Sequence, residues 1–265
     1  MPISAFFEEQ IINTHNAAFA EKKPLIITFI GSGGKTSLIW LLARCLAGNP
    51  QRKILVTPST KMFPPSEKYY AHYFVKPPGA AEAGITLAGK YNRTTGKLES
   101  FALPELERSA ALFDLVLIEG DGSRELPLKG WAEYEPVVPA CTDYTIGIIP
   151  LWPLGMVLSE KIIFRLPEFC ALCGAQPGDT LTPEHLAAVI GGNEGCRSLF
   201  SAGRGSQILF LNCREMPAEP YLSGEIINLL NENFKRTLHT IASINIQQNN
   251  MYPLNNILKT FPKPY

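Results

Sequence analysis

Six consecutive residues carry the strongest chemical signal in the chain. Gly31-Ser32-Gly33-Gly34-Lys35-Thr36 follows the apolar run LIITFI and precedes the helical pattern SLIWLLARCLA. Glycines let backbone N–H groups turn inward around an anion, and the start of a helix adds partial positive charge. A lysine and a hydroxyl at the end of such a loop suit nucleotide phosphates and Mg²⁺. The segment therefore predicts a phosphate-binding loop.

This loop is shorter than the common one. In the G-x-x-x-x-G-K-[ST] spacing a glycine stands six positions before the lysine, whereas here that position is Phe29, within the apolar run. A tight strand-to-helix turn with an incidental lysine is the alternative, and the flanking elements disfavour it. We predict ATP or GTP binding, with Lys35 on the phosphates and Thr36 on Mg²⁺. The predicted nucleotide-binding residues are Gly31, Ser32, Gly33, Gly34, Lys35, Thr36 and Ser37.

An acidic residue closes a second apolar run. Residues 114–119 read DLVLIE, so Glu119 ends a predicted buried strand, and Asp121 follows between two glycines. Mg²⁺ requires near-ideal ligand placement, so we predict the strand-fixed Glu119 as the metal ligand. Asp121 is predicted to be the mobile group that contacts a substrate, although a turn-forming aspartate is the plain alternative. Lys35, Glu119 and Asp121 are the predicted catalytic residues.

Polar residues in two further loops are candidates for holding a second substrate. Thr60 and Lys61 follow the next apolar run, KILVT, and Arg124, Lys129 and Glu135 follow the acidic loop. Cationic side chains at that sheet edge suit an anionic co-substrate. Helix capping by Thr60 and a solvated surface for the others remain open alternatives.

Two other motifs give weaker signals. Asn212 ends a predicted strand where G proteins place N-K-x-D to read guanine, but Cys213 and Glu215 stand in the lysine and aspartate positions. The nucleobase therefore stays open. Cys170 and Cys173 form a C-x-x-C, which requires a second pair of ligands to hold a structural zinc. Because their segment also has a helical pattern, we expect these cysteines to pack.

Alternating strands and helices must position these loops. Short apolar runs at 25–30, 53–57, 115–118, 144–150 and 207–212 predict strands buried on both faces, and helical patterns lie between several of them. This alternation is typical of an α/β fold with a mostly parallel sheet flanked by helices, here P-loop NTPase-like. Such sheets bind ligands at the carboxyl ends of their strands, which is where the polar loops lie.

The remaining segments are expected to belong to the same single domain, apart from a C-terminal tail. Residues 5–20 predict a helix, and 222–238 an amphipathic helix. A hairpin insertion is predicted near 84–101, because TTGK stands between two β-capable runs. We expect a single domain over 1–245 and an Asn/Pro-rich tail over 246–265.

Composition narrows the class of protein. Of 265 residues, 46% are hydrophobic, so a disordered chain is excluded. Lys+Arg and Asp+Glu both total 24, which removes the general electrostatic argument for nucleic-acid or anionic-membrane binding. The six cysteines are too scattered for a disulfide framework, and the first residues show no secretory pattern. We expect a cytoplasmic protein with neither a nucleic-acid nor a membrane partner.

Three segments in this order resemble a known family. FIGSGGKTSLIWLLA, ILVTPSTKMFPP and LVLIEGDGSRELPLKGWAEYEPVVP are similar to the P-loop accessory proteins of selenium-dependent molybdenum hydroxylases, also called selenium-cofactor biosynthesis accessory proteins. The resemblance runs from about Leu25 to beyond Asn212. It implies a bacterial maturation factor whose partner is an apo molybdenum hydroxylase or its cofactor. The residues it carries over are Gly31–Thr36, Thr60, Lys61, Glu119–Asp121, Lys129 and Glu133–Pro136.

One departure is visible within the carried-over residues. The family usually has His-Glu-Pro where this chain has Tyr134-Glu135-Pro136. The sequence LNCRE also departs from the more Lys/Asp-like pattern expected after the fifth strand, which weakens a base-reading role there.

Two function hypotheses from different classes follow. The first is an NTP-dependent, Mg²⁺-requiring accessory enzyme that acts by NTP hydrolysis or group transfer. The second is a nucleotide-switched binding protein, similar to metallochaperone GTPases, without small-molecule chemistry of its own. The third hypothesis is a nucleotide-binding scaffold without turnover, which the unusual loop spacing at Phe29 favours. The nucleobase, second substrate, client and oligomeric state are left open.

Overall fold

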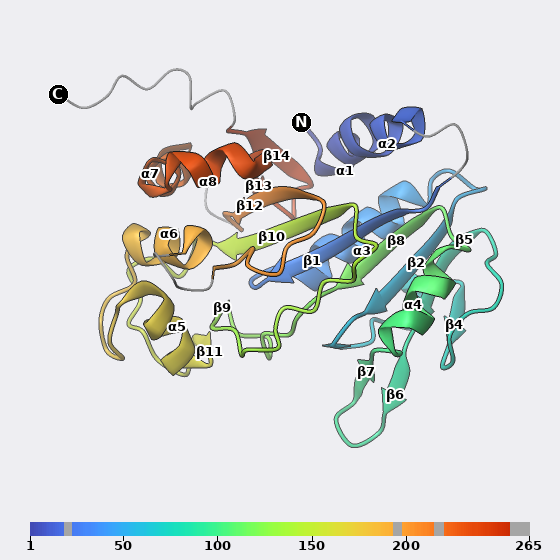
Figure 1. The fold of residues 1–265 in the computed structure, drawn as a ribbon, viewed down its shortest axis with the longest axis horizontal. Helices are drawn as coiled ribbons and strands as arrows, with labels where there is room; N and C mark the ends of the chain where they lie inside the picture. Colours follow the sequence, from blue (N-terminus) through green and yellow to red (C-terminus); the bar gives the residue numbers. More distant parts are fainter. Residues whose placement is uncertain (19–22, 193–197, 215–219, 255–265) are drawn as a thin grey trace.

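A twisted central sheet organises the protein (Figure 1). The computed structural model describes residues 1–18, 23–192, 198–214 and 220–254. Its strands are β1 (Leu25–Gly31), β2 (Lys53–Pro58), β3 (Lys61–Met62), β4 (His72–Phe74), β5 (Gly84–Ala88), β6 (Lys90–Asn92), β7 (Lys97–Glu99), β8 (Leu115–Glu119), β9 (Leu128–Lys129), β10 (Tyr144–Pro150), β11 (Ile163–Phe164), β12 (Ser206–Asn212), β13 (Leu238–Asn245) and β14 (Asn250–Pro253).

The strand order confirms the predicted α/β fold with a mostly parallel sheet. Nine of these strands form one sheet in the order β14-β13-β12-β10-β1-β8-β2-β5-β4, and its neighbours run parallel except at β13–β14. The five apolar runs of the sequence correspond to β1, β2, β8, β10 and β12. Because β8 and β10 both pair directly with β1, the loops that leave these three strands share one edge of the sheet.

Helices cover both faces of the sheet. They are α1 (Ile3–Phe6), the π-helical η1 (Phe7–Ile12), α2 (Asn13–Ala18), α3 (Lys35–Leu46), the 3₁₀ turn η2 (Glu67–Tyr69), α4 (Leu103–Ala110), α5 (Leu166–Cys173), α6 (Pro183–Gly191), α7 (Pro220–Leu229) and α8 (Glu232–Thr237). Figure 1 shows α3 behind the sheet and α4 in front of it. No helix in the described part of the chain has the length and apolar character that crossing a membrane requires.

Alternation along β1 divides the core into two layers. Ile27 and Phe29 pack under α3 and the N-terminal helix, whereas Ile26 and Ile30 pack on the opposite face. This is the two-residue period of a strand buried on both sides. It explains why the segment is apolar on both faces rather than at every second position, with Thr28 as a buried polar exception whose hydroxyl pairs with Thr142 at 2.8 Å.

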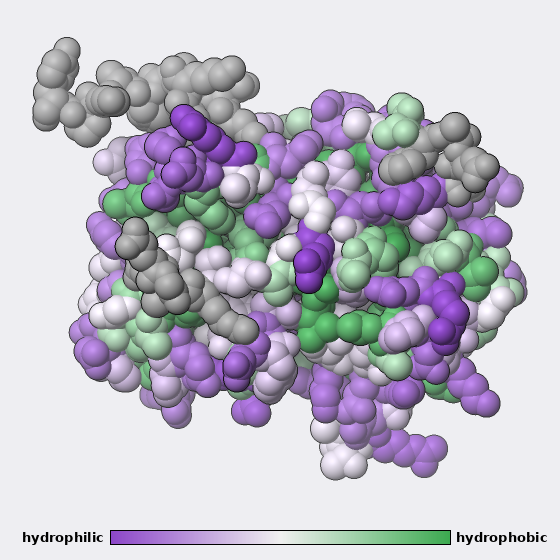
Figure 2. Space-filling view, viewed as in Figure 1, coloured by the Kyte–Doolittle hydropathy of each residue, from purple (hydrophilic) through white to green (hydrophobic). Residues whose placement is uncertain are grey.

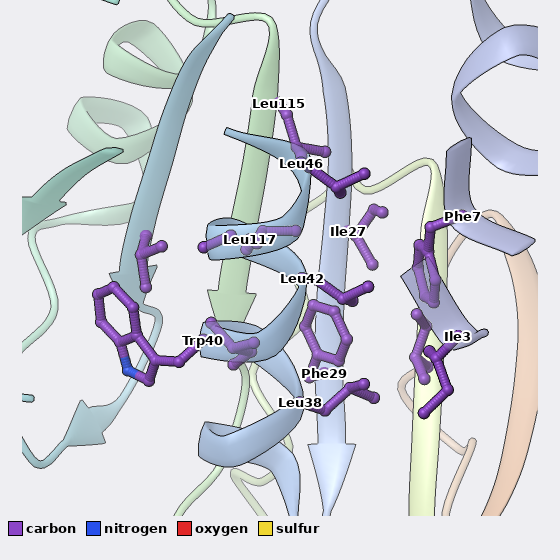
Figure 3. Close-up of a cluster of buried hydrophobic side chains, with 14 of the residues drawn as sticks. Ile3, Phe7, Ile27, Phe29, Leu38, Trp40, Leu42, Leu46, Leu115 and Leu117 are labelled. Carbon is purple, nitrogen blue, oxygen red and sulfur yellow. The ribbon is translucent and has the colours of Figure 1, made fainter. Parts of the chain in front are cut away.

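The helix α3 is held by a stripe of leucines. Leu38, Leu42 and Leu46 recur at four-residue spacing, are buried, and lie against Phe29 and Leu117 of the sheet (Figure 3). Residues four apart share a helix face, so this stripe sets the direction in which α3 leaves the glycine loop.

The predicted hairpin insertion is present with different bounds. Residues 84–88 form β5, a strand of the main sheet parallel to β2, because Ile85 and Leu87 are buried in the core beneath α3. The hairpin itself is β6–β7, and β3 pairs with β7 to make a three-stranded sheet. Figure 2 shows that the projecting end of this hairpin is mainly hydrophilic.

The C-terminal predictions need correction. Residues 250–253, assigned to a tail, form β14 against β13, with Met251 fully buried. The helix predicted over 222–238 is broken into α7 and α8, because the side chain of Asn231 caps α8 by accepting a hydrogen bond from Asn233 N at 2.8 Å. Leu238 then begins β13. Residues 255–265 lie outside the described residues.

The packing of α3 makes a stability prediction. Leu42→Ala should lower the free energy of unfolding by about 2–5 kcal/mol, because the leucine side chain has no exposed surface and leaves a cavity. Leu41→Ala, on the partly buried flank of the same helix, should cost less than half as much. Urea unfolding followed by circular dichroism measures both values. Equal losses would contradict the orientation of α3.

Candidate functional site

The glycine loop connects β1 to α3 at the centre of the sheet edge. Gly31 has a φ of +95°, and a Cβ there would lie 2.2 Å from Ile148 O. Gly33 has a φ of +68°, and its Cβ would lie 2.4 Å from Pro150 Cγ. L-residues with side chains rarely adopt such backbone angles. The neighbouring strand β10 therefore requires glycine at both positions.

A pocket of about 450 Å³ opens above this loop. Its volume lies within the range of small-molecule sites. Gly33 to Ser37 line its floor, and the strands on each side of β1 supply its two walls. The β10, β12 and β13 side contributes Trp152, Asn212, Arg214, Ile246 and Gln247, and the β8 and β2 side contributes Lys61, Met62, Phe63, Lys97 and residues 122–127.

The predicted magnesium ligands meet at the floor of the pocket. Thr36 Oγ1 donates a hydrogen bond to Glu119 Oε2 at 2.7 Å. Burial raises the pKa of Glu119, and the nearby Lys35 and the Thr36 hydroxyl offset this only in part. A hydroxyl and a buried carboxylate are hard oxygen donors that suit Mg²⁺, which takes its remaining ligands from water and phosphates. The donor set fits the ion that the sequence implies.

Lys35 is engaged within the protein rather than extended into the pocket. Its Nζ donates to Gly31 O and lies 3.2 Å from Asp121 Oδ1. Only 4% of the lysine side chain is exposed. To bind a nucleotide phosphate, Lys35 Nζ must leave these partners.

The prediction of a mobile Asp121 is wrong. Its side chain is fully buried and does not line the pocket. It accepts hydrogen bonds from Trp131 Nε1 at 2.7 Å and from Gly31 N at 3.2 Å. Burial raises the pKa of Asp121, but Lys35 and Lys129 more than offset it and hold that pKa below its usual value. Asp121 therefore lies behind the loop and supports it.

Gly120, the glycine before Asp121, restricts it instead of loosening it. A Cβ on Gly120 would lie 2.9 Å from Ile30 Cγ2 and from Thr28 Cγ2, so this residue is glycine because β1 approaches closely. Gly120 N also donates to Phe29 O at 2.8 Å. A glycine is expected both in a loose loop and where a neighbouring strand approaches closely, so the sequence alone does not distinguish the two.

Two predicted second-substrate residues do not reach the pocket. Lys129 is fully buried, with Nζ 3.2 Å from Asp121 Oδ2 and 2.8 Å from Glu135 Oε2. Glu135 also pairs with Arg165. Both belong to a charged cluster beneath the pocket wall, which sequence reasoning missed because Arg165 lies thirty residues beyond Glu135.

The other second-substrate residues divide in the same way. Lys61 and Arg124 line the pocket, whereas Thr60 does not. Sequence reasoning missed Lys97, which the hairpin brings to the same wall, where its charge lowers the pKa of Glu119 slightly. Lys97 Nζ lies 4.4 Å from the ring centroid of Phe63, so a cation and an aromatic face stand together there.

Asn212 supports the loop, which differs from a base-reading role. Its Nδ2 donates to Gly33 O at 2.7 Å, and its Oδ1 accepts from Arg214 N at 3.2 Å. The guanidinium of Arg214 lies 5.3 Å from the ring centroid of Trp152. These two side chains give this wall a flat surface, but they do not discriminate between nucleobases.

The cysteine pair lies on α5, as the helical pattern predicted. Cys173 Sγ donates to Phe169 O at 3.3 Å, and burial raises the pKa of both Cys170 and Cys173. Within the described ranges, no three His, Cys, Asp or Glu side chains gather into a metal-binding group.

Comparison with known proteins places the chain in a family. The family model described as "YqeC protein" matches residues 27–167. The chain belongs to the YqeC family. It is 30% identical over 203 residues to the uncharacterized protein YqeC of Escherichia coli (strain K12), a match that covers 71% of this chain and 79% of that relative. No solved structure matches it.

The matched region has a structural meaning. Residues 27–167 contain the glycine loop, Glu119 and the charged cluster that ends at Arg165. The wall formed by Asn212 and Arg214 lies beyond it. The family model therefore spans the floor of the pocket, its β8–β2 wall and, of the opposite wall, Trp152.

The floor of the pocket makes a prediction about the metal. Glu119→Gln should weaken Mg²⁺-dependent nucleotide binding by at least about tenfold, because an amide oxygen is a poorer Mg²⁺ ligand than a carboxylate. Glu168→Gln, an exposed carboxylate that does not line the pocket, is the matched control. Calorimetric titration with and without Mg²⁺ measures the effect. Equal weakening in both conditions would show that Glu119 acts without the metal.

Proposed function

We propose that this protein is an NTP-binding, Mg²⁺-dependent accessory protein in the maturation of a selenium-dependent molybdenum hydroxylase or its cofactor, acting by NTP hydrolysis or group transfer. The contact between Thr36 and Glu119 at the floor of the pocket carries the nucleotide part of the proposal. The resemblance of the three segments around 31–36, 60–61 and 119–136 supports the maturation role. Membership of the YqeC family is compatible with that role.

The residues have distinct roles in this proposal. The amides of the loop from Gly31 to Thr36 surround the phosphates, as backbone N–H groups at a helix start do. Lys35 Nζ moves onto the β- and γ-phosphates. Thr36 and Glu119 hold Mg²⁺, which when bound neutralises charge on the phosphate oxygens. Either water or an anionic acceptor would receive the terminal phosphoryl group, with the nucleoside diphosphate as the leaving group, or an anionic acceptor would receive the nucleotidyl group, with pyrophosphate as the leaving group.

The β8–β2 wall suits an anionic second substrate. Lys61, Lys97 and Arg124 line it together with one carboxylate, Glu125, and Glu99 pairs with Lys61 at 2.7 Å, so cations remain in excess. Excess positive charge in a concave site attracts anions. The exposed ring of Phe63 adds an apolar face beside these cations. The opposite wall, with Trp152 and Arg214, remains for the base of ATP or GTP.

A nucleotide-switched binding protein, similar to metallochaperone GTPases, is the second candidate function. One observation favours it: the charged cluster runs from Lys35 at the loop to Arg165, which contacts the exposed Tyr134. A partner protein that binds at this surface residue would thereby detect whether the loop holds nucleotide phosphates. The nucleotide site is the same in both candidates.

The phosphate loop can be tested through its lysine. Lys35→Ala should abolish ATP and GTP binding, because a neutral methyl group cannot contact the phosphates. Binding of a fluorescent nucleotide analogue measures this, with Lys76→Ala, an exposed lysine away from the pocket, as the control. Unchanged affinity in Lys35→Ala would refute the phosphate-loop assignment.

Turnover assays separate the two candidate functions. Phosphate release is measured with ATP and with GTP, alone and with a molybdopterin-type cofactor or the client hydroxylase. A transferase should turn over with the small-molecule acceptor and no client. A switch should hydrolyse slowly alone and accelerate with its client. Absence of stimulation by either would contradict the maturation role.

A further inference from the structure

Five charged side chains form a continuous chain that starts at the glycine loop. Lys35 Nζ lies 3.2 Å from Asp121, Asp121 lies 3.2 Å from Lys129 Nζ, and Lys129 Nζ lies 2.8 Å from Glu135. Arg165 Nη1 closes the chain on Glu135. Exposure rises along it, from zero at Asp121 and Lys129 to 9% at Glu135 and 17% at Arg165. Solvent therefore screens these charges little, except at the far end.

The charges of this chain balance once one of its three cations has left. All five groups together carry three positive and two negative charges. Without Lys35, two carboxylates face two cations, and the sum is zero. An uncompensated buried charge is costly, so the group can lose one cation and stay neutral, and of its three cations only Lys35 lines the pocket. Asp121 would still have Lys129, Trp131 Nε1 and Gly31 N as partners.

We propose that Asp121, Lys129, Glu135 and Arg165 are positioning residues for Lys35, and that their summed charge sets how readily Lys35 Nζ leaves Asp121 for a nucleotide phosphate. Without a nucleotide, Lys35 Nζ stays paired with Asp121. An incoming phosphate competes with Asp121 for it, and Lys129 compensates Asp121 once Lys35 has left. The inference rests on the nucleotide-binding part of the proposed function and not on the client or the reaction.

The far end of the chain is fixed by the pocket wall. β9 and β11 pair so that Lys129 lies opposite Phe164, the residue before Arg165. The Phe164 ring has the Arg124 and Arg165 guanidinium groups each 4.6 Å from its centroid. Arg124 and Arg165 also have φ values of +53° and +59°. Backbone in this region persists only where the surroundings impose it, so Arg165 is held in place and not a loose surface charge.

The proposal predicts opposite effects from the two members of one ion pair. Glu135→Gln leaves the chain without Lys35 at +1, which repels Lys35 and should tighten nucleotide binding by about three- to tenfold. Arg165→Gln leaves it at −1, which retains Lys35 and should weaken binding by a similar factor. The double variant returns the sum to zero and should bind like the wild type. A merely structural pair would instead show weakening in both single variants.

The experiment measures the dissociation constant of Mg²⁺-ATP and Mg²⁺-GTP by calorimetry for the full-length wild type, both single variants and the double variant. Thermal unfolding of each sample records its stability separately. Glu168→Gln and Lys161→Gln make the same changes of charge at exposed positions near Arg165 and should leave affinity unchanged. Arg165→Lys keeps the charge and should retain most of the wild-type affinity.

Each possible order of affinities either supports or contradicts the charge-balance proposal. The expected order of affinity is Glu135→Gln tightest, wild type and double variant equal, and Arg165→Gln weakest. If both single variants weaken binding, or if neither differs from the controls, the charge-balance proposal is wrong. If Glu135→Gln does not fold, Arg165→Gln against Arg165→Lys still decides, because equal affinities overturn it. If the wild type binds neither nucleotide, the proposed function fails first and this inference with it.

Discussion

The direct parallel pairing of β1 with β8 is the constraint on which the site depends. It sets Phe29 opposite Glu119, with Gly120 N bonded to Phe29 O at 2.8 Å. The end of β8 is therefore fixed beside the glycine loop, so that Thr36 reaches Glu119 at 2.7 Å and Gly31 N reaches Asp121 at 3.2 Å. One carboxylate faces the pocket and the other lies behind the loop. Their separation into two roles follows from the end of β8 at Glu119, because Asp121 lies beyond the strand and does not share the face that a two-residue spacing within it would give.

The same arrangement gives the pocket two unlike walls. β1 lies in the middle of the sheet, so the exits of β10, β12 and β13 form one wall and those of β8 and β2 the other. Only the second wall receives the hairpin residue Lys97 and rests on the buried charges at Lys129 and Glu135. A nucleotide seated on the loop would thus have Trp152, Asn212 and the single cation Arg214 on one side, and three cations on the other.

The sequence predicted what depends on local patterns. Unbroken apolar runs identified the central strands, and the glycine loop and Glu119 were found because each follows such a run. What it missed depends on partners distant along the chain. Asp121 is rigid because of Trp131 and Lys129, and Lys97 reaches the pocket only through strand pairing in the hairpin. The prediction of a tail failed because the residues before Met251 are polar, whereas Met251 is buried through the pairing of β14 with β13.

The central claim is that phosphates and Mg²⁺ occupy the pocket floor. A crystal structure with Mg²⁺ and a non-hydrolysable ATP or GTP analogue tests it most directly. The account predicts Mg²⁺ between Thr36 Oγ1 and Glu119, in place of their direct hydrogen bond, and Lys35 Nζ moved from Asp121 to the phosphates. A structure with the analogue bound elsewhere, or with the Lys35–Asp121 and Thr36–Glu119 contacts intact beneath it, would contradict the account.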